Sequence, residues 1–295
     1  MKHRVEYLAV RAVFGLVRIV PEPLVRAAGT LLGRVFYVVD RSHRRTAERN
    51  LAAAFPGRST RERRAIARGA FEHFGRLGFE ILKFATLSDR AMLARVEFDG
   101  LDRVKAAYAH GRGVLLYTGH FGYWELHALV HALELEPMGV LARALDNHDL
   151  NLLLERIRRR TGNTVIYRQG TLRRVLRMLQ ARHAVAILID QHVHERDAVQ
   201  VDFFERPAAT TPLVAALAIR TGAPVVPCFA LPLGGGRFRM IYEHPIEPPQ
   251  APDDAAGGGE PDILREFTQR CTDVLEMYVR RRPELWLWMH RRWRD

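Results

Sequence analysis

The 295-residue chain has few residues of the kinds that cross-link proteins or hold metals through thiolates. It contains only two cysteines, Cys228 and Cys271. Two cysteines cannot build a disulfide framework, and these two lack metal-ligand spacing. We therefore expect buried thiols in a protein of a reducing compartment. Internal repeats are also absent, so a repeat architecture is not expected.

The sequence also lacks a long uninterrupted apolar run. The N-terminal stretch 5–20 is apolar, but Glu6, Arg11 and Arg18 interrupt it and Pro21 follows. It is too short and too charged for a transmembrane helix, and it lacks the cleavage site of a secretory signal. The pattern is typical of a helix lying in the lipid interface, with arginines at the headgroups, or of a helix packed against the protein.

Acidic residues are too few to balance the positive charge of the lysines and arginines. Lys and Arg together number 45 against 33 Asp and Glu, which gives a formal charge of +12, carried largely by arginine. Such a chain attracts nucleic acid, anionic lipid or an acidic carrier protein. No recognised motif interleaves aromatic residues with the basic runs, so a nucleic-acid partner is not expected.

The pattern of apolar residues changes near residue 90. Residues 1–90 read as helical, and Ser59 with Glu62 has the spacing of a capping box at a helix start. Beyond that point, short apolar runs that suit strands buried on both faces alternate with helical stretches, at 113–117, 184–189 and 224–230. This alternation predicts an α/β core over 91–295, with a mixed sheet flanked by helices, preceded by a helical, membrane-associating region over 1–90.

Two further features concern the C-terminal third. Three glycines at 234–236 followed by 237–242 predict a hairpin into an edge strand. Residues 247–261 are rich in Pro, Gly and Asp and read as an exposed loop, after which Asp262 is expected to cap a last helix reaching about Arg281.

The segment 118–126 combines His120 and Glu125 directly after a predicted strand, where α/β sheets place their sites. On one continuous helix the two side chains would point about 140° apart. They can pair only if His120 stays on the loop and Glu125 lies in the first helical turn, and Gly119 and Gly122 allow such a bend. Glu125 would then orient the imidazole, while the other ring nitrogen takes a proton from an attacking hydroxyl.

The spacing His120-x4-Glu125 resembles the His-x4-Asp/Glu box of glycerolipid acyltransferases, and it is closely similar to that of the bacterial lipid A late acyltransferases, which transfer lauroyl or myristoyl groups. The resemblance runs in order over residues 45–293. Further segments that resemble this family are Asn50-Leu51 with Ala54-Phe55-Pro56, Asp190-Gln191, Phe203-Phe204 through Thr210-Thr211, and Pro283-Glu284 through Arg292.

The resemblance implies a glycerolipid-acyltransferase-like fold and an O-acyltransferase without cofactor or metal. The donor would be a thioester of acyl carrier protein or coenzyme A, and the acceptor a hydroxyl, including an acyl-chain hydroxyl, of a lipid A precursor. The expected location is the cytoplasmic face of the bacterial inner membrane, peripheral or N-terminally anchored. A related branch acylates phosphatidylinositol mannosides, so another glycolipid acceptor is the alternative.

The resemblance also implies roles for individual residues. His120 and Glu125 are the catalytic pair. An arginine that binds substrate falls near 156–168, where Arg159 is favoured and Arg160 and Arg168 are alternatives. The remaining substrate-binding candidates are Asp190, which positions a substrate or a basic side chain, and Gln191, Arg206 and Thr210.

A metal-dependent hydrolase is the alternative of a different class. His127 and His131 lie four residues apart on a predicted helix, and His192 and His194 flank one loop position, which is spacing that can hold zinc. The expected function of these histidines is otherwise structural. Trp286 and Trp288 are expected to face the core from a short strand, although a place at the lipid–water boundary is the alternative.

Overall fold

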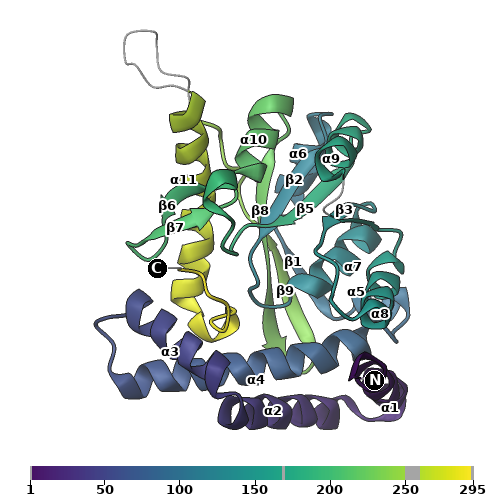
Figure 1. Ribbon diagram of the computed structural model, residues 1–295. Helices are drawn as coiled ribbons and strands as arrows, with labels where there is room; N and C mark the ends of the chain where they lie inside the picture. The colour runs from purple at the N-terminus through teal and green to yellow at the C-terminus, as the bar shows by residue number, and fades with distance from the viewer. Residues whose placement is uncertain (1, 168–169, 250–259, 294–295) are drawn as a thin grey trace.

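The computed structural model describes residues 2–167, 170–249 and 260–293 (Figure 1). Helices form the first part of the chain and precede an α/β unit. The helices of this first part are α1 (Lys2–Ile19), α2 (Glu22–Val39), α3 (Arg41–Ala54), α4 (Thr60–Phe84) and α5 (Asp89–Leu93). Within the described ranges, no helix combines the length and the apolarity that crossing a bilayer requires.

Helix α4 begins as predicted. The Ser59 hydroxyl accepts from the Glu62 backbone N–H, while the Glu62 carboxylate accepts from the Ser59 N–H at 2.8 Å, so both halves of the capping box are present. This satisfies two backbone donors that a helix start otherwise leaves unpaired.

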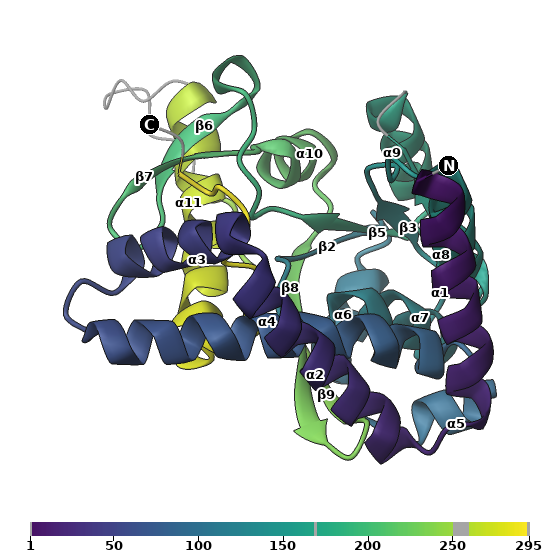
Figure 2. The same cartoon turned by 60° about the horizontal axis from the view of Figure 1, so that its bottom comes forward.

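Helix α2 packs closely along α4 at a crossing built from glycines (Figure 2). A Cβ atom added to Gly75 would lie 2.3 Å from the carbonyl oxygen of Gly29, and one added to Gly33 would lie 2.2 Å from that of Phe71. Side chains at these positions would push the two backbones apart. The glycines therefore fix α2 against α4, and α4 in turn contacts α7.

In the described part of the chain, the main sheet has seven strands in the order β1-β9-β8-β2-β5-β3-β4. Strand β8 pairs with β9 antiparallel, and the other pairs of this sheet are parallel. Its strands are β1 (Val96–Asp99), β2 (Val114–Thr118), β3 (Gly139–Leu141), β4 (Thr164–Ile166), β5 (Ala184–Leu188), β8 (Val225–Gly234) and β9 (Arg237–Tyr242). A separate antiparallel pair consists of β6 (Val199–Asp202) and β7 (Pro207–Thr210).

Helices cover both faces of the sheet. Leu115, Tyr117 and Val185 belong to one core cluster with apolar residues of α9, α10 and α11, whereas Leu116 and Val226 belong to a second cluster with residues of α6, α7 and α8. These helices are α6 (Leu101–Ala109), α7 (Trp124–Glu134), α8 (His148–Arg159), α9 (Thr171–Gln180), α10 (Leu213–Thr221) and α11 (Glu260–Arg281). The mixed α/β fold predicted from the sequence is confirmed.

The three predicted central strands are β2, β5 and β8, and the predicted hairpin is β8–β9. The expectation that 237–242 forms an edge strand is wrong, because β1 pairs in parallel with the free side of β9. The last helix ends at Arg281 as expected but begins at Glu260, before Asp262. Residues 250–259 of the predicted 247–261 loop lie outside the described residues. The division into regions 1–90 and 91–295 stays a prediction.

Candidate active site

The loop that follows β2 carries His120, and the surrounding chain holds its backbone. The Gly122 N–H donates to the Leu285 carbonyl at 3.0 Å, the Tyr123 N–H to that of Ala230 at 2.8 Å, and the carbonyl of His120 accepts from the Leu287 N–H at 3.1 Å. Gly122 has φ +58° and a Cβ atom there would lie 2.1 Å from the Ala230 oxygen, so the turn requires glycine. His120 therefore sits on a rigid loop.

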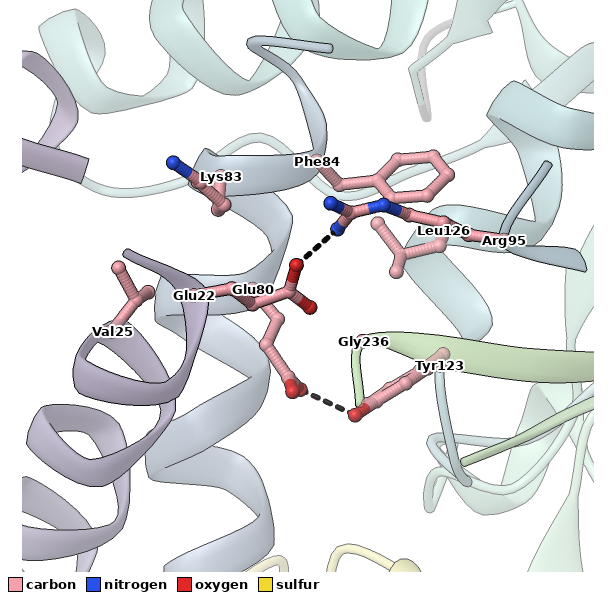
Figure 3. Close-up of a pocket in the computed structure, with 9 residues that line it drawn as sticks. All are labelled: Glu22, Val25, Glu80, Lys83, Phe84, Arg95, Tyr123, Leu126 and Gly236. Carbon is pink, nitrogen blue, oxygen red and sulfur yellow. Dashed lines mark hydrogen bonds and ion pairs between the residues drawn. The ribbon is translucent and has the colours of Figure 1, made fainter. Parts of the chain in front are cut away.

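Tyr123 anchors this loop to the helical region. Its hydroxyl donates a short hydrogen bond to the buried Glu80 carboxylate on α4, and Arg26 of α2 forms an ion pair with Glu80 at 3.0 Å. Figure 3 shows Glu80 and Tyr123 meeting in a small pocket beside the Arg95–Glu22 ion pair. Burial raises the pKa of Glu80, although the Tyr123 hydrogen bond and Arg26 oppose this. Through Glu80 and Arg26, the helices α4 and α2 thus hold the loop that carries His120 in place.

His120 is paired with Asp190. The Nδ1 atom of His120 lies 2.8 Å from Asp190 Oδ1, and the His120 backbone N–H donates to Asp190 Oδ2 at 2.7 Å. Asp190 follows the end of β5, the sheet neighbour of β2, and its side chain is only 2% exposed. Burial lowers the pKa of His120, but the Asp190 carboxylate outweighs it and the net pKa is raised. The same pair keeps the pKa of Asp190 lowered despite burial.

Hydrogen bonding assigns the two nitrogens of the imidazole. Because Asp190 accepts at Nδ1, the proton of the neutral ring belongs on Nδ1 and the lone pair on Nε2. The Nε2 atom lies 3.3 Å from the Gln191 amide nitrogen, and the ring packs 5.3 Å from that of Trp124. The Nε2 side of His120 therefore carries the basic lone pair next to the exposed Gln191.

Two buried tryptophans complete the support of Asp190. The Trp286 Nε1–H donates to Asp190 Oδ2 at 2.8 Å, and the ring of Trp288 packs edge-on against Trp286 at 4.6 Å. Residues 286 and 121 form an isolated antiparallel bridge. The expectation that Trp286 and Trp288 face the core is confirmed, but the expected short strand is not, because Trp286 forms only an isolated bridge and Trp288 lies in a turn. Phe203 and Phe204 are buried in the same cluster.

The predicted pairing of His120 with Glu125 is corrected by the structure. Glu125 lies in the first turn of α7, as expected, but its carboxylate accepts two hydrogen bonds from Arg158 of α8, one of them from Nε at 2.9 Å. The reason is the turn at Gly122, since the loop carries His120 towards the end of β5 while the first turn of α7 faces α8. Burial lowers the pKa of Arg158, but Glu125 raises it, with a net increase. Whether Glu125 takes part in catalysis stays a prediction.

The other predicted substrate-binding residues are distributed more widely. Arg159 is 56% exposed and forms an ion pair with Glu155, whereas Arg158 beside it is 12% exposed. Arg160 donates to carbonyl groups of Ala85 and Leu87. Arg168 lies outside the described residues. Of the arginines at 156–160, Arg158 is the one that bonds to Glu125, and its charge lowers the pKa of His120.

Thr210 is the last residue of β7, and Arg206 lies in the connection between β6 and β7; neither has a described contact with His120. Thr210 is fully buried and accepts a hydrogen bond from Arg292, while the Arg206 guanidinium lies 6.0 Å from the Trp293 ring. Burial lowers the pKa of Arg292 to about 10. Thr210 therefore has a structural partner, and the substrate-binding role stays a prediction for both residues.

The histidines of the metal alternative do not form a metal-binding cluster within the described residues. His131 is buried between the hydroxyls of Tyr108 and Tyr242, at 2.9 and 2.8 Å, and burial lowers its pKa to about 3. His127 packs beside it, and burial lowers its pKa as well. Across residues 2–167, 170–249 and 260–293, no three His, Cys, Asp or Glu side chains are arranged to hold a metal ion. Nothing in this part of the chain supports a metal hydrolase.

A buried carboxylate paired with a histidine whose Nε2 carries the lone pair, at the ends of parallel strands, can act chemically as a general base for a hydroxyl. The family model described as bacterial lipid A biosynthesis acyltransferase matches residues 1–295. The chain therefore belongs to the bacterial lipid A biosynthesis acyltransferase family and is an acyltransferase.

Curated relatives agree with this family. The chain is 28% identical to a lipid A biosynthesis lauroyltransferase of Escherichia coli over 284 residues, which cover 96% of this chain and 89% of the relative. It is 25% identical to a lipid A biosynthesis myristoyltransferase of the same organism, over 96% of this chain and 84% of the relative. It is also similar to a phosphatidylinositol mannoside acyltransferase of Mycobacterium tuberculosis, at 24% identity over 76% and 69% of the two chains.

Proposed function

We propose that the protein transfers a fatty acyl group from a thioester, of acyl carrier protein or coenzyme A, to a hydroxyl of a lipid A precursor, with His120 as the general base. The observation that carries this proposal is the Asp190–His120 pair at the carboxyl ends of β2 and β5, in a chain that the family model matches along its whole length.

In the proposed reaction, Nε2 of His120 takes the proton of the acceptor hydroxyl as its oxygen attacks the thioester carbonyl. The new C–O bond forms, the C–S bond breaks, and the leaving thiolate takes the proton back from the imidazolium. Asp190 stabilises the imidazolium while it exists. No covalent acyl-enzyme is needed, so the reaction requires neither a serine nor a cysteine nucleophile.

Arg158 is the proposed source of positive charge for the oxygen of the thioester carbonyl. The backbone N–H groups of residues 120–123 all donate within the protein, so they are not free to bind this oxygen. Arg158 is close enough to His120 for its charge to lower the histidine's pKa, which favours the neutral, basic form. Glu125 fixes the guanidinium in place by its two hydrogen bonds.

We further propose that α1 and α2 lie on the cytoplasmic face of the bacterial inner membrane. Among the residues that the structure describes, eleven of the sixteen exposed large hydrophobic side chains belong to these two helices. They are Val5, Leu8, Leu16, Ile19, Leu24, Leu31, Leu32, Val35, Phe36, Val38 and Val39. Exposed arginines accompany them on α1, as in helices that bind anionic lipid surfaces.

The proposal is tested by transfer from lauroyl-acyl carrier protein to a lipid A precursor in detergent. His120→Gln should lose activity by at least about 100-fold, as expected when a general base is removed. His110→Gln, at an exposed position at the end of α6, is the matched control and should keep full activity. Full activity of the His120 variant would refute the mechanism. Transfer to phosphatidylinositol mannoside but not to the lipid A precursor would show that the acceptor is the alternative glycolipid.

A vesicle flotation assay tests the membrane proposal separately. The protein should float with vesicles that contain phosphatidylglycerol, and Leu32→Glu with Phe36→Glu on α2 should prevent this while leaving transfer in detergent unchanged. Flotation of the double variant at the level of the unchanged protein would refute a role for α2.

A further inference from the structure

The outer surface of α3 and the start of α4 form a groove lined by arginines. The groove has a volume of about 840 Å³. It is lined by Arg41, Ser42, Arg45, Glu48, Arg49, Ala52, Thr60, Arg63 and Arg64, and we call it the arginine groove. Five of the nine lining residues are arginines, and none is a large apolar residue.

This part of the chain carries an unusual share of the positive charge. Residues 41–68 contain nine arginines, two glutamates and no lysine or aspartate, which gives a formal charge of +7 of the +12 of the whole chain. Arg41, Arg45 and Arg49 are exposed, follow one another at four-residue spacing on α3, and have no ion-pair partner within the described ranges. Like charges at this spacing destabilise a helix. These three arginines therefore destabilise α3, and no ion pair within the described residues offsets this cost.

The shape and polarity of the arginine groove favour a protein partner over a bilayer. Exposed large hydrophobic side chains gather on α1 and α2, whereas α3 has none. A flat lipid surface binds helices through such side chains together with basic ones. A concave, basic, non-apolar groove instead complements the convex acidic surface of another protein.

The inner face of α3 connects the arginine groove to the His120 site. Asn50 of α3 donates to the carbonyl oxygens of Trp288 and His290 at 2.8 and 2.7 Å. Trp288 packs on Trp286, which holds Asp190. Figures 1 and 2 show α3 beside the first half of α4, on the opposite side of the molecule from α1. A carrier bound there would approach the site from the α3 side, and α1 and α2 would stay free for the membrane.

We propose that the arginine groove docks the acidic carrier protein that delivers the acyl thioester to His120. This inference rests on the proposed function, because it assumes that a thioester donor reacts at His120. The groove would bind the protein part of the donor, while the acyl chain and its flexible thiol arm extend past α3 to the site.

The test uses the full-length protein and two lauroyl donors. One is lauroyl-acyl carrier protein, and the other is lauroyl-pantetheine, which has the same thioester but no acidic protein. The charge-reversal variant Arg45→Glu/Arg49→Glu/Arg64→Glu should raise KM for the carrier donor at least about tenfold and leave the pantetheine reaction unchanged. The control Arg173→Glu/Arg174→Glu/Arg177→Glu changes the total charge equally on exposed positions of α9 and should leave both reactions unchanged.

Several outcomes would overturn the docking proposal. The first is an equal loss of activity with both donors in a folded variant. The second is a raised KM for the acceptor with lauroyl-pantetheine, which would assign the groove to the acceptor's phosphates. The third is a loss of vesicle flotation, which would assign the groove to the membrane. If the charge-reversal variant does not fold, the neutral Arg45→Gln/Arg49→Gln/Arg64→Gln variant replaces it.

A binding measurement separates failure of docking from failure of the proposed function. Fluorescence anisotropy of a labelled carrier protein reports docking without any transfer. Binding that the charge-reversal variant loses would support the groove even if neither donor reacted. Transfer from both donors without binding of the carrier to the groove would overturn docking and leave the proposed function intact.

Discussion

Asp190 holds His120 by two hydrogen bonds, one to the imidazole Nδ1 at 2.8 Å and one from the backbone N–H at 2.7 Å. The two residues are 70 positions apart in the chain, but their strands β5 and β2 are neighbours in the sheet. The carboxylate therefore sets both the position of the loop and the direction of the ring. This leaves only Nε2 for proton transfer.

Replacing Asp190 by Asn should change the pH profile of acyl transfer as well as its rate. The free base must be neutral, so kcat/KM falls as the pH drops through the pKa of His120. Asp190 is the main cause that raises this pKa. Without its charge the pKa falls, and the acidic limb of the profile should move to lower pH while kcat drops by about 10³- to 10⁴-fold. An unmoved acidic limb would contradict the pairing. Asp202→Asn, at an exposed position of β6, is the control.

Arg158 and Arg159 are neighbours in sequence, but we expect their replacement to affect the stability of the protein very differently. Arg158→Gln leaves the Glu125 carboxylate, which is only 14% exposed, without its partner, and this should reduce the free energy of unfolding by about 3 kcal/mol. Arg159→Gln removes an exposed ion pair and should change stability by less than about 0.5 kcal/mol. Urea unfolding of both variants measures this difference. Similar losses of unfolding free energy in the two variants would contradict the view that Arg158 is the structural partner of Glu125.

The double variant Glu125→Gln/Arg158→Gln separates structural support from catalysis. It no longer buries an unpaired charge, so much of the lost stability should return. If Arg158 stabilises the carbonyl oxygen, acyl transfer stays low in the stable double variant. Recovery of activity together with stability would limit the pair to a structural role.

The sequence predicted those elements that depend on local patterns. The capping box at Ser59 and Glu62 fixed the start of α4, and continuous apolar runs predicted β2, β5 and β8. It also placed His120 on a loop and Glu125 in a first helical turn. These features depend on residues that are close in the chain, where spacing carries the information.

The partner of His120 depends on sheet order, which spacing does not encode. The family resemblance implies that Asp190 positions a substrate or a basic side chain, but it does not identify His120 as the partner, because β2 and β5 are separated by two other strands in the chain. Only the order β2-β5 brings Asp190 to His120 and leaves Glu125 to Arg158. The short strands β3 and β4, of three residues each, carry too few residues for a clear period, so they were not predicted.

Two glycines of α4 provide a matched test of the α2–α4 crossing. Gly75→Ala places a Cβ 2.3 Å from the Gly29 oxygen, so the backbones must separate and stability should fall by about 1–3 kcal/mol. Gly78→Ala meets nothing within 4 Å and should stabilise the helix by about 0.5–1 kcal/mol. Thermal unfolding of the two variants gives the sign of each change. A stabilised Gly75 variant would mean that the crossing is not close.

The buried histidines should make the protein sensitive to acid. His73 and His131 each have a pKa lowered by burial from 6.5 to about 3. Between these values the unfolded chain binds more protons than the folded one, so the free energy of unfolding falls as the pH drops below 6.5. Each such histidine contributes a slope of up to about 1.4 kcal/mol per pH unit.

His131→Gln should therefore give a shallower dependence of unfolding free energy on pH between 6.5 and 5, measured by urea unfolding. The substitution removes the group that titrates, although it also weakens the contacts with Tyr108 and Tyr242 and so lowers stability at neutral pH. Tyr108→Phe loses one of the same hydrogen bonds but keeps the histidine, so its curve should lie below that of the unchanged protein with the same slope. If the His131 variant instead kept the full slope, the acid sensitivity would have to come from other groups, with His73 and His127 as the first two to replace.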